Sequence, residues 1–93
     1  MTDSNVLTML KTDLQISVSA TQYDEYLKNL ITLARAAIGK EGIELADNVE
    51  DGMLVEMYAA YLYRKRREEN IAMPRSLRYA MNNRLFSQKG STT

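Results

Sequence analysis

The sequence contains no cysteine and no histidine, and it has only one proline among its 93 residues. Without cysteine, the chain can form neither a disulfide framework nor a thiolate zinc site. Without histidine, it lacks the commonest general base and the commonest metal ligand, so most routes to catalysis are closed. We therefore expect a protein that is not an enzyme and that binds no cofactor.

One catalytic alternative stays open, because carboxylates alone can bind a metal ion. Asp47, Glu50 and Asp51 lie close together in the sequence. The same three residues are also what the start of a helix favours, since a side-chain oxygen there accepts backbone N–H groups. We find neither a glycine-rich phosphate loop nor a nucleophile beside a base.

Features of a membrane or secreted protein are also missing. Residues 1–5 show neither a basic start nor an apolar run, so we expect no signal peptide. The longest apolar stretch, residues 53–63, includes Glu56 and is well short of the roughly 20 residues that span a membrane. We expect a soluble chain with no membrane contact and no small-molecule substrate.

Helical periodicity dominates the rest of the sequence. Apolar residues recur three and four positions apart in four segments separated by short polar or glycine-containing stretches. The prediction is an all-α protein, a small bundle of four helices with a central apolar third helix, in a single domain over residues 1–87 and with a disordered tail at 88–93. The predicted helices cover about residues 5–15, 22–38, from 47 or 51 to 69, and 74–87.

The predicted third helix is apolar around almost its whole circumference between residues 53 and 63. A helix of that kind is buried on all sides. We expect three short neighbours to cover about two-thirds of it, and the uncovered part then indicates a contact between subunits. Tyr58, Tyr61 and Tyr63 either belong to this contact or are ordinary core residues with hydroxyls at the rim.

Basic residues follow this segment. Arg64 to Arg67 are either an electrostatic contact with an acidic partner or nucleic acid, or a solvated helix end in which Arg64 pairs with Glu68 and Lys65 with residue 69. The stripe of Arg75, Arg78 and Asn82 is either a DNA-reading face or a solvent-facing one. The candidate interface residues are Tyr58, Tyr61, Tyr63, Arg64, Arg66, Arg67, Arg75 and Arg78.

The charges are unevenly distributed although the net charge is zero. Residues 1–56 contain ten acidic and four basic side chains, whereas residues 57–93 contain two acidic and eight basic ones. The two parts thus carry −6 and +6. This split is either chance or a device for head-to-tail association of copies.

Length, order and spacing together resemble the short head-tail connector proteins of long-tailed bacteriophages and prophages, also called DNA-packaging adaptors. No single motif is specific, and the match spans nearly the whole chain. The segments that carry the resemblance are residues 9–16 (MLKTDLQI), 26–38 (YLKNLITLARAAI), 51–54 (DGML) with 58–63 (YAAYLY), and 73–78 (MPRSLR) with 82–85 (NNRL).

The resemblance implies a helical virion assembly subunit that forms a homo-oligomeric ring of about a dozen copies. Such a ring lies beneath the portal protein in the virion neck, after assembly in the host cytoplasm. It joins the capsid to head-closure or tail proteins, and packaged DNA passes through its lumen. The family has no catalytic residues to carry over. A small DNA-binding regulator that uses the basic C-terminal helix is the alternative hypothesis.

Overall fold

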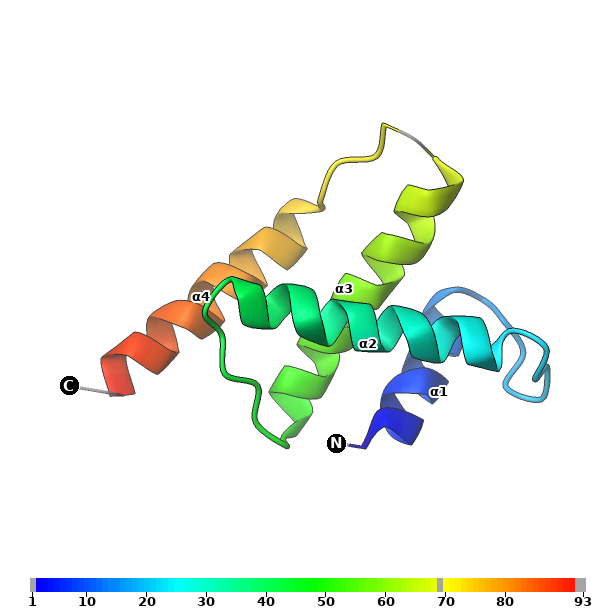
Figure 1. Cartoon of the computed structure of the whole chain (residues 1–93), viewed down its shortest axis with the longest axis horizontal. Helices are drawn as coiled ribbons and strands as arrows, with labels where there is room; N and C mark the ends of the chain where they lie inside the picture. Colours follow the sequence, from blue (N-terminus) through cyan, green and yellow to red (C-terminus); the bar gives the residue numbers. More distant parts are fainter. Residues whose placement is uncertain (1, 69, 92–93) are drawn as a thin grey trace.

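Four α-helices make up the computed structural model, which describes residues 2–68 and 70–91 (Figure 1). The helices are α1 (Asp3–Asp13), α2 (Asp24–Lys40), α3 (Val49–Arg67) and α4 (Arg75–Ser91). Helix α3 contacts each of the other three; α2 lies across it, and α4 returns beside it in the opposite direction. The predicted all-α fold, a small four-helix bundle, is confirmed.

The helices begin at different residues from those predicted because different side chains cap them. The Asn48 side chain accepts the N–H of Asp51 at 2.8 Å, which makes Asn48 the N-cap of α3 in place of Asp47 or Asp51. Similarly, Thr2 caps α1 by accepting the N–H of Asn5. Gly42 follows α2 with a φ of 93°, the left-handed conformation expected of a glycine after a helix.

The core forms where α1, α2 and α4 meet α3. Its buried side chains come from all four helices and from Ile43 in the loop before α3, as the apolar periodicity predicted. The fully buried large side chains include Leu10, Leu27, Ile38, Val55, Leu77 and Met81.

The apolar stretch of α3 is covered only in part, and Met53 at its start is 48% exposed. Residues 54–56 and 58–61 are all buried within one chain, and Tyr58 and Tyr61 are only 9% and 8% exposed. Met57, in the same stretch, is half-buried. Three neighbours cover this helix because α2 crosses it while α1 and α4 lie against other sides. The uncovered part of this stretch is therefore formed by Met53, Met57, Leu62 and Tyr63, and Tyr58 and Tyr61 do not belong to it.

The predicted boundary at residue 87 is also wrong, because α4 continues to Ser91. Gln88, assigned to a disordered tail, instead donates from Nε2 to the carbonyl of Gly42 at 2.8 Å and accepts the N–H of Glu44 at 2.7 Å. These contacts hold the last turns of the helix against the loop before α3. Residues 92 and 93 of the predicted tail lie outside the described residues.

One acidic side chain lies within the apolar part of α3. Glu56 is 8% exposed, and its Oε2 atom has no hydrogen-bond partner in the described part of the chain. The pKa of Glu56 is raised to about 8, first by burial and then by hydrogen bonding to Asp13 and the negative charge of Asp13, while Arg64 opposes the shift. At neutral pH this carboxyl group is therefore mostly protonated in the folded chain.

Glu56→Gln should remove a pH dependence of stability. The unfolded chain ionises Glu56 near its ordinary pKa of 4.5 and the folded chain only near 8, so the free energy of unfolding falls as the pH rises between these values. Each unit of difference is worth about 1.4 kcal/mol, so the variant should gain a few kcal/mol over the wild type at pH 8. Urea unfolding from pH 4 to 9 measures this.

Glu25→Gln is the matched control, because Glu25 is an exposed glutamate of α2. It should leave the pH profile unchanged. A Glu56→Gln profile that parallels the wild type would show that Glu56 is ionised in the folded chain.

Candidate partner interface

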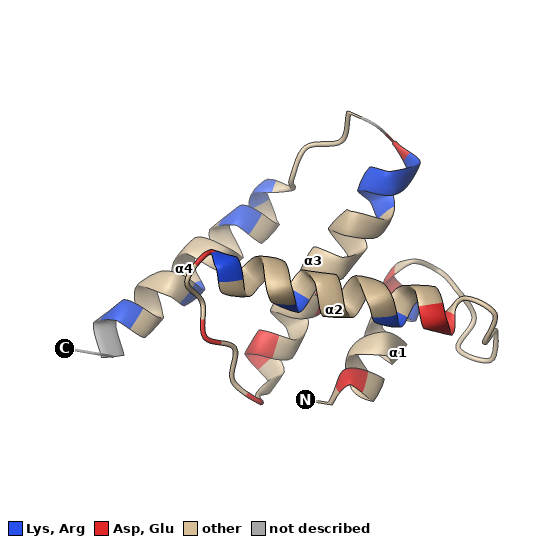
Figure 2. Cartoon of the chain, in the orientation of Figure 1, with Lys and Arg blue, Asp and Glu red and all other residues tan. Residues whose placement is uncertain are grey.

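The candidate interface residues lie at the end of the molecule where α3 finishes and α4 begins. Figure 2 shows Lys and Arg gathered in the last turns of α3 and along the first turns of α4. Residues 68–74 connect these two helix ends. Basic side chains from two separate helices therefore come to one end of the fold. This end carries much of the positive charge that the sequence places after residue 57.

Two of the three candidate tyrosines are core residues, which corrects their assignment as interface residues. Tyr58 and Tyr61 are almost fully buried, and their rings meet edge to face with centroids 5.8 Å apart. Burial, followed by the negative charge of Glu41, raises the pKa of Tyr58. Both tyrosines lie on the sides of α3 that the neighbouring helices cover.

The basic residues at the end of α3 lie over tyrosine rings. The cationic groups of Lys65, Arg66 and Arg67 are 5.7, 5.7 and 4.7 Å from the ring centroids of three different tyrosines. Cation–π contacts at such exposed positions are worth about 0.5–1 kcal/mol each. The tyrosines beneath them are, in the same order, Tyr61, Tyr26 and Tyr63.

These contacts explain how four consecutive basic residues are accommodated. Arg64 does not pair with Glu68; its guanidinium lies 3.5 Å from the carboxylate of Asp13 in α1. Lys65 turns to a ring, and the pairing expected for it falls on residue 69, outside the described residues. The side chains of this tract thus contact residues of α1, α2 and α3. Lys65, Arg66 and Arg67 stay exposed to solvent while they lie over tyrosine rings.

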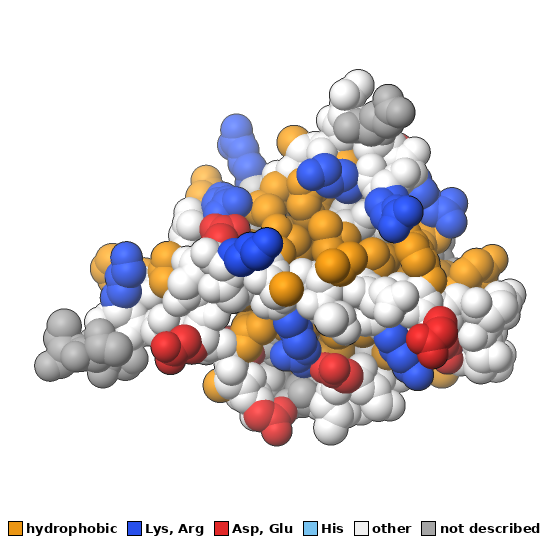
Figure 3. All heavy atoms as spheres, viewed as in Figure 1, with side chains coloured by type: hydrophobic (Ala, Val, Ile, Leu, Met, Phe, Trp, Pro, Cys, Tyr) orange, Lys and Arg blue, Asp and Glu red, His pale blue; other side chains and the backbone are white. Residues whose placement is uncertain are grey.

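Partly exposed apolar side chains lie beside these cations. Figure 3 shows them gathered over the end of α3 and the start of α4, with Lys and Arg around them. An apolar centre with a charged rim is typical of protein–protein contact surfaces. The half-buried apolar residues of these two elements and of the segment between them include Met57, Leu62, Tyr63, Ile71, Met73 and Ala80.

The arginines of α4 differ in what they contact. Arg78 donates to Glu41 at 2.8 Å, and both side chains are half-exposed. Arg84 points into the molecule, whereas Arg75 is exposed at the first turn. Of the proposed DNA-reading stripe, Arg75 and Asn82 are therefore presented to solvent and Arg78 is engaged within the chain.

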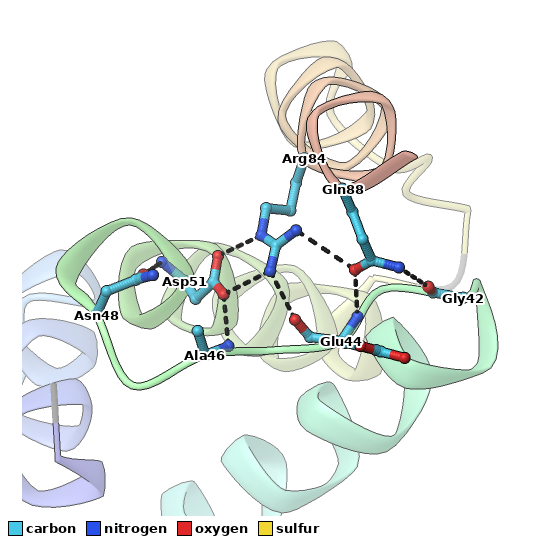
Figure 4. A network of polar contacts seen from close by, with 7 residues as sticks. All are labelled: Gly42, Glu44, Ala46, Asn48, Asp51, Arg84 and Gln88. Atoms are coloured by element: carbon cyan, nitrogen blue, oxygen red, sulfur yellow. Dashed lines mark hydrogen bonds and ion pairs between the residues drawn. The ribbon is translucent and has the colours of Figure 1, made fainter. Parts of the chain in front are cut away.

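Arg84 is the residue that holds α4 in place, and sequence reasoning missed its role. Its Nε atom donates to Asp51 at 2.7 Å, and its Nη2 atom donates to Asp51 at 3.1 Å and to the carbonyl of Glu44 at 2.6 Å (Figure 4). Asp51 is 2% exposed and also accepts the N–H of Ala46 at 2.6 Å. Gln88, one turn on, completes the network by bridging Gly42 and Glu44 (Figure 4).

The ionised form of Asp51 is stabilised although the residue is buried. Burial raises the pKa of Asp51, but the hydrogen bonds from Arg84 and Ala46 and the charge of Arg84 lower it more, so the net shift is downward. Asp51 is therefore committed to this network. It does not join Asp47 and Glu50 in a metal site, and no group of three metal-ligating side chains gathers among residues 2–68 and 70–91.

The surface has hollows both away from this end of the molecule and beside it. One of about 410 Å³ lies between α1 and α2, and its Asp24 already accepts Lys11 Nζ at 2.6 Å. A smaller one of about 160 Å³ lies beside the end of α3 and is lined by Arg64 and Pro74 among others. Within the described ranges, no helix is both long enough and apolar enough to cross a bilayer.

Comparison with protein-family models, with curated proteins and with solved structures gave no match.

Arg84→Met should destabilise the chain by about 3 kcal/mol, because it leaves Asp51 buried and ionised without its partner. Asp51→Asn combined with Arg84→Met should lose less than the sum of the two single changes, since neither partner then remains as an uncompensated charge. Urea unfolding at pH 7 measures the double-mutant cycle. Arg75→Met, at an exposed arginine of the same helix, is the control. If the losses in free energy of unfolding for Arg84→Met and Asp51→Asn simply add in the double variant, the ion pair contributes nothing by pairing.

Proposed function

We propose that this chain is a structural assembly subunit of a tailed bacteriophage or prophage, a head-tail connector that forms a ring under the portal protein. In this role it joins the capsid to head-closure or tail proteins in the virion neck, and DNA passes through the ring. The class of protein rests on the sequence resemblance. The need for partners rests on a feature of α4.

That feature, which carries the proposal, is the presence of apolar side chains on two opposite sides of α4. Leu77 and Met81 are 1% exposed and pack into the core. Tyr79 and Phe86 are 62% and 79% exposed on the other side. A small helical domain gains nothing within its own fold from large aromatic side chains in water, whereas aromatic residues are enriched where proteins meet.

Charge supports a protein partner over free solvent. From residue 70 onward the chain has four basic and no acidic side chains. Arg78 and Arg84 contact acidic side chains within the chain, so the positive charge exposed beside the aromatics of α4 comes from Arg75 and Lys89. The cations stacked on tyrosines at the end of α3 extend this surface. An acidic and partly apolar surface on a neighbouring protein is its complement.

The DNA-binding alternative gains less from the structure. A reading helix needs its arginines free for phosphates and base edges. Arg78 and Arg84 instead contact Glu41 and Asp51 within the chain.

The proposal predicts stable rings, formed either by the protein alone or on its portal. Sedimentation analysis and negative-stain images of the purified chain, alone and mixed with the portal protein encoded in the same gene cluster, should show a closed ring. The gene itself should lie with those for portal and capsid.

A chain that stays monomeric at high concentration both alone and with portal would refute the connector assignment. Titration of labelled duplex DNA at low salt tests the alternative, because phosphate contacts strengthen as salt is lowered. Tight, salt-sensitive binding by the monomer would favour the regulator instead.

A further inference from the structure

The exposed aromatic residues of α4 lie on one straight strip. Arg75, Tyr79, Asn82 and Phe86 follow at alternating intervals of four and three residues, which keeps them on the same side of a helix with 100° between residues. All four are exposed. We call these four residues the outer face of α4; the strip points away from Arg84, which is nine residues from Arg75 and so on the opposite side.

A second exposed apolar strip lies at the start of α3. Val49 and Met53 are 56% and 48% exposed and lie one turn apart, with exposed Glu50 beside them. We call these three residues the first-turn face of α3. Residues 41–63 contain no basic side chain, and their exposed acidic side chains include Glu44, Asp47 and Glu50, so this face lies in an acidic part of the chain.

The two faces are complementary in kind. One offers aromatic side chains with basic neighbours, and the other offers smaller apolar side chains with acidic neighbours. Electrostatic complementarity of this sort sets the partner and the register of a contact.

One molecule cannot bring its own two faces together. Asp51 of α3 points toward Arg84 of α4, as the ion pair between them shows (Figure 4). Val49 and Met53 each lie two residues from Asp51, about 160° around the helix from it, and the outer face of α4 lies opposite Arg84. The faces thus point away from each other across the α3–α4 contact, so only another molecule can join them.

We propose that the outer face of α4 is the docking surface for the first-turn face of α3 of a second copy of this chain. The inference rests on the homo-oligomeric part of the proposed function and names the surfaces that meet. Because the two faces differ and lie on opposite sides, each docked copy leaves one face free for the next. Such heterologous contacts close into a ring when the rotation between copies permits it.

Two blocked chains test this pairing. Phe86→Asp blocks the outer face of α4, and Met53→Lys blocks the first-turn face of α3; both residues are exposed, so the fold should survive, which circular dichroism checks. Each variant alone should self-associate at least tenfold more weakly than the wild type. An equimolar mixture should form a dimer and stop there, because one complementary pair of faces remains. A mixture that behaves as the two variants do separately would overturn the pairing.

Cross-linking extends the test to a chain that assembles weakly. The protein has no cysteine of its own, so single introduced cysteines report only their own contacts. A mixture of Val49→Cys and Phe86→Cys chains, treated with a short bis-maleimide, should give several-fold more dimer than Val49→Cys with Leu33→Cys. Leu33 is an equally exposed apolar residue of α2, 55% exposed.

Equal yields in the two mixtures would overturn the pairing. Rings without this preference would refute the pairing and leave the connector assignment standing. A cross-linking preference for Val49→Cys with Phe86→Cys, without rings or portal binding, would support the pairing and refute the connector assignment.

Discussion

The ion pair between Asp51 and Arg84 is the contact on which the arrangement of this molecule depends. Among the side chains of α4 that the structure describes, only Leu77 and Met81 are completely buried, so apolar packing alone holds the helix weakly. Arg84 fixes the rotation of the helix by reaching both oxygens of Asp51 and the carbonyl of Glu44. That rotation decides which residues of α4 face the core and which face a partner.

Two buried carboxyl groups of α3 show how surroundings determine charge. Asp51 is ionised because a guanidinium and a backbone N–H surround it. Glu56, five residues further, faces apolar side chains and the negative charge of Asp13, and it holds its proton at neutral pH. Asp51 therefore contributes stability above its ordinary pKa of 3.8, whereas Glu56 costs stability as the pH rises toward 8.

Periodicity predicted the four helices and most of the core, because the spacing of apolar residues is a local property. It could not predict that Arg84 pairs with a residue 33 positions earlier, or that Gln88 extends α4 by bonding a loop 44 to 46 positions away. For the same reason it could not predict that Tyr58 and Tyr61 lie on the covered sides of α3, since this depends on how α2 crosses. Of the candidate interface, the basic residues at the end of α3 and Tyr63 were identifiable from sequence, but the tyrosine beneath Arg66 was not, because Tyr26 comes from another helix.

The weak apolar packing of α4 against the rest of the fold has a thermodynamic consequence. Helices α1, α2 and α3 share most of the buried apolar surface, so α4 can open as a separate cooperative unit at a lower free energy than global unfolding requires. A partner that binds α4 only when the helix is packed against α3 can bind only the fraction of molecules in which it is packed. Its apparent affinity is reduced by that fraction. A first partner bound to α4 keeps the helix packed and so raises the affinity for a second partner that also needs the packed helix. The two binding events are then cooperative without any change in the core.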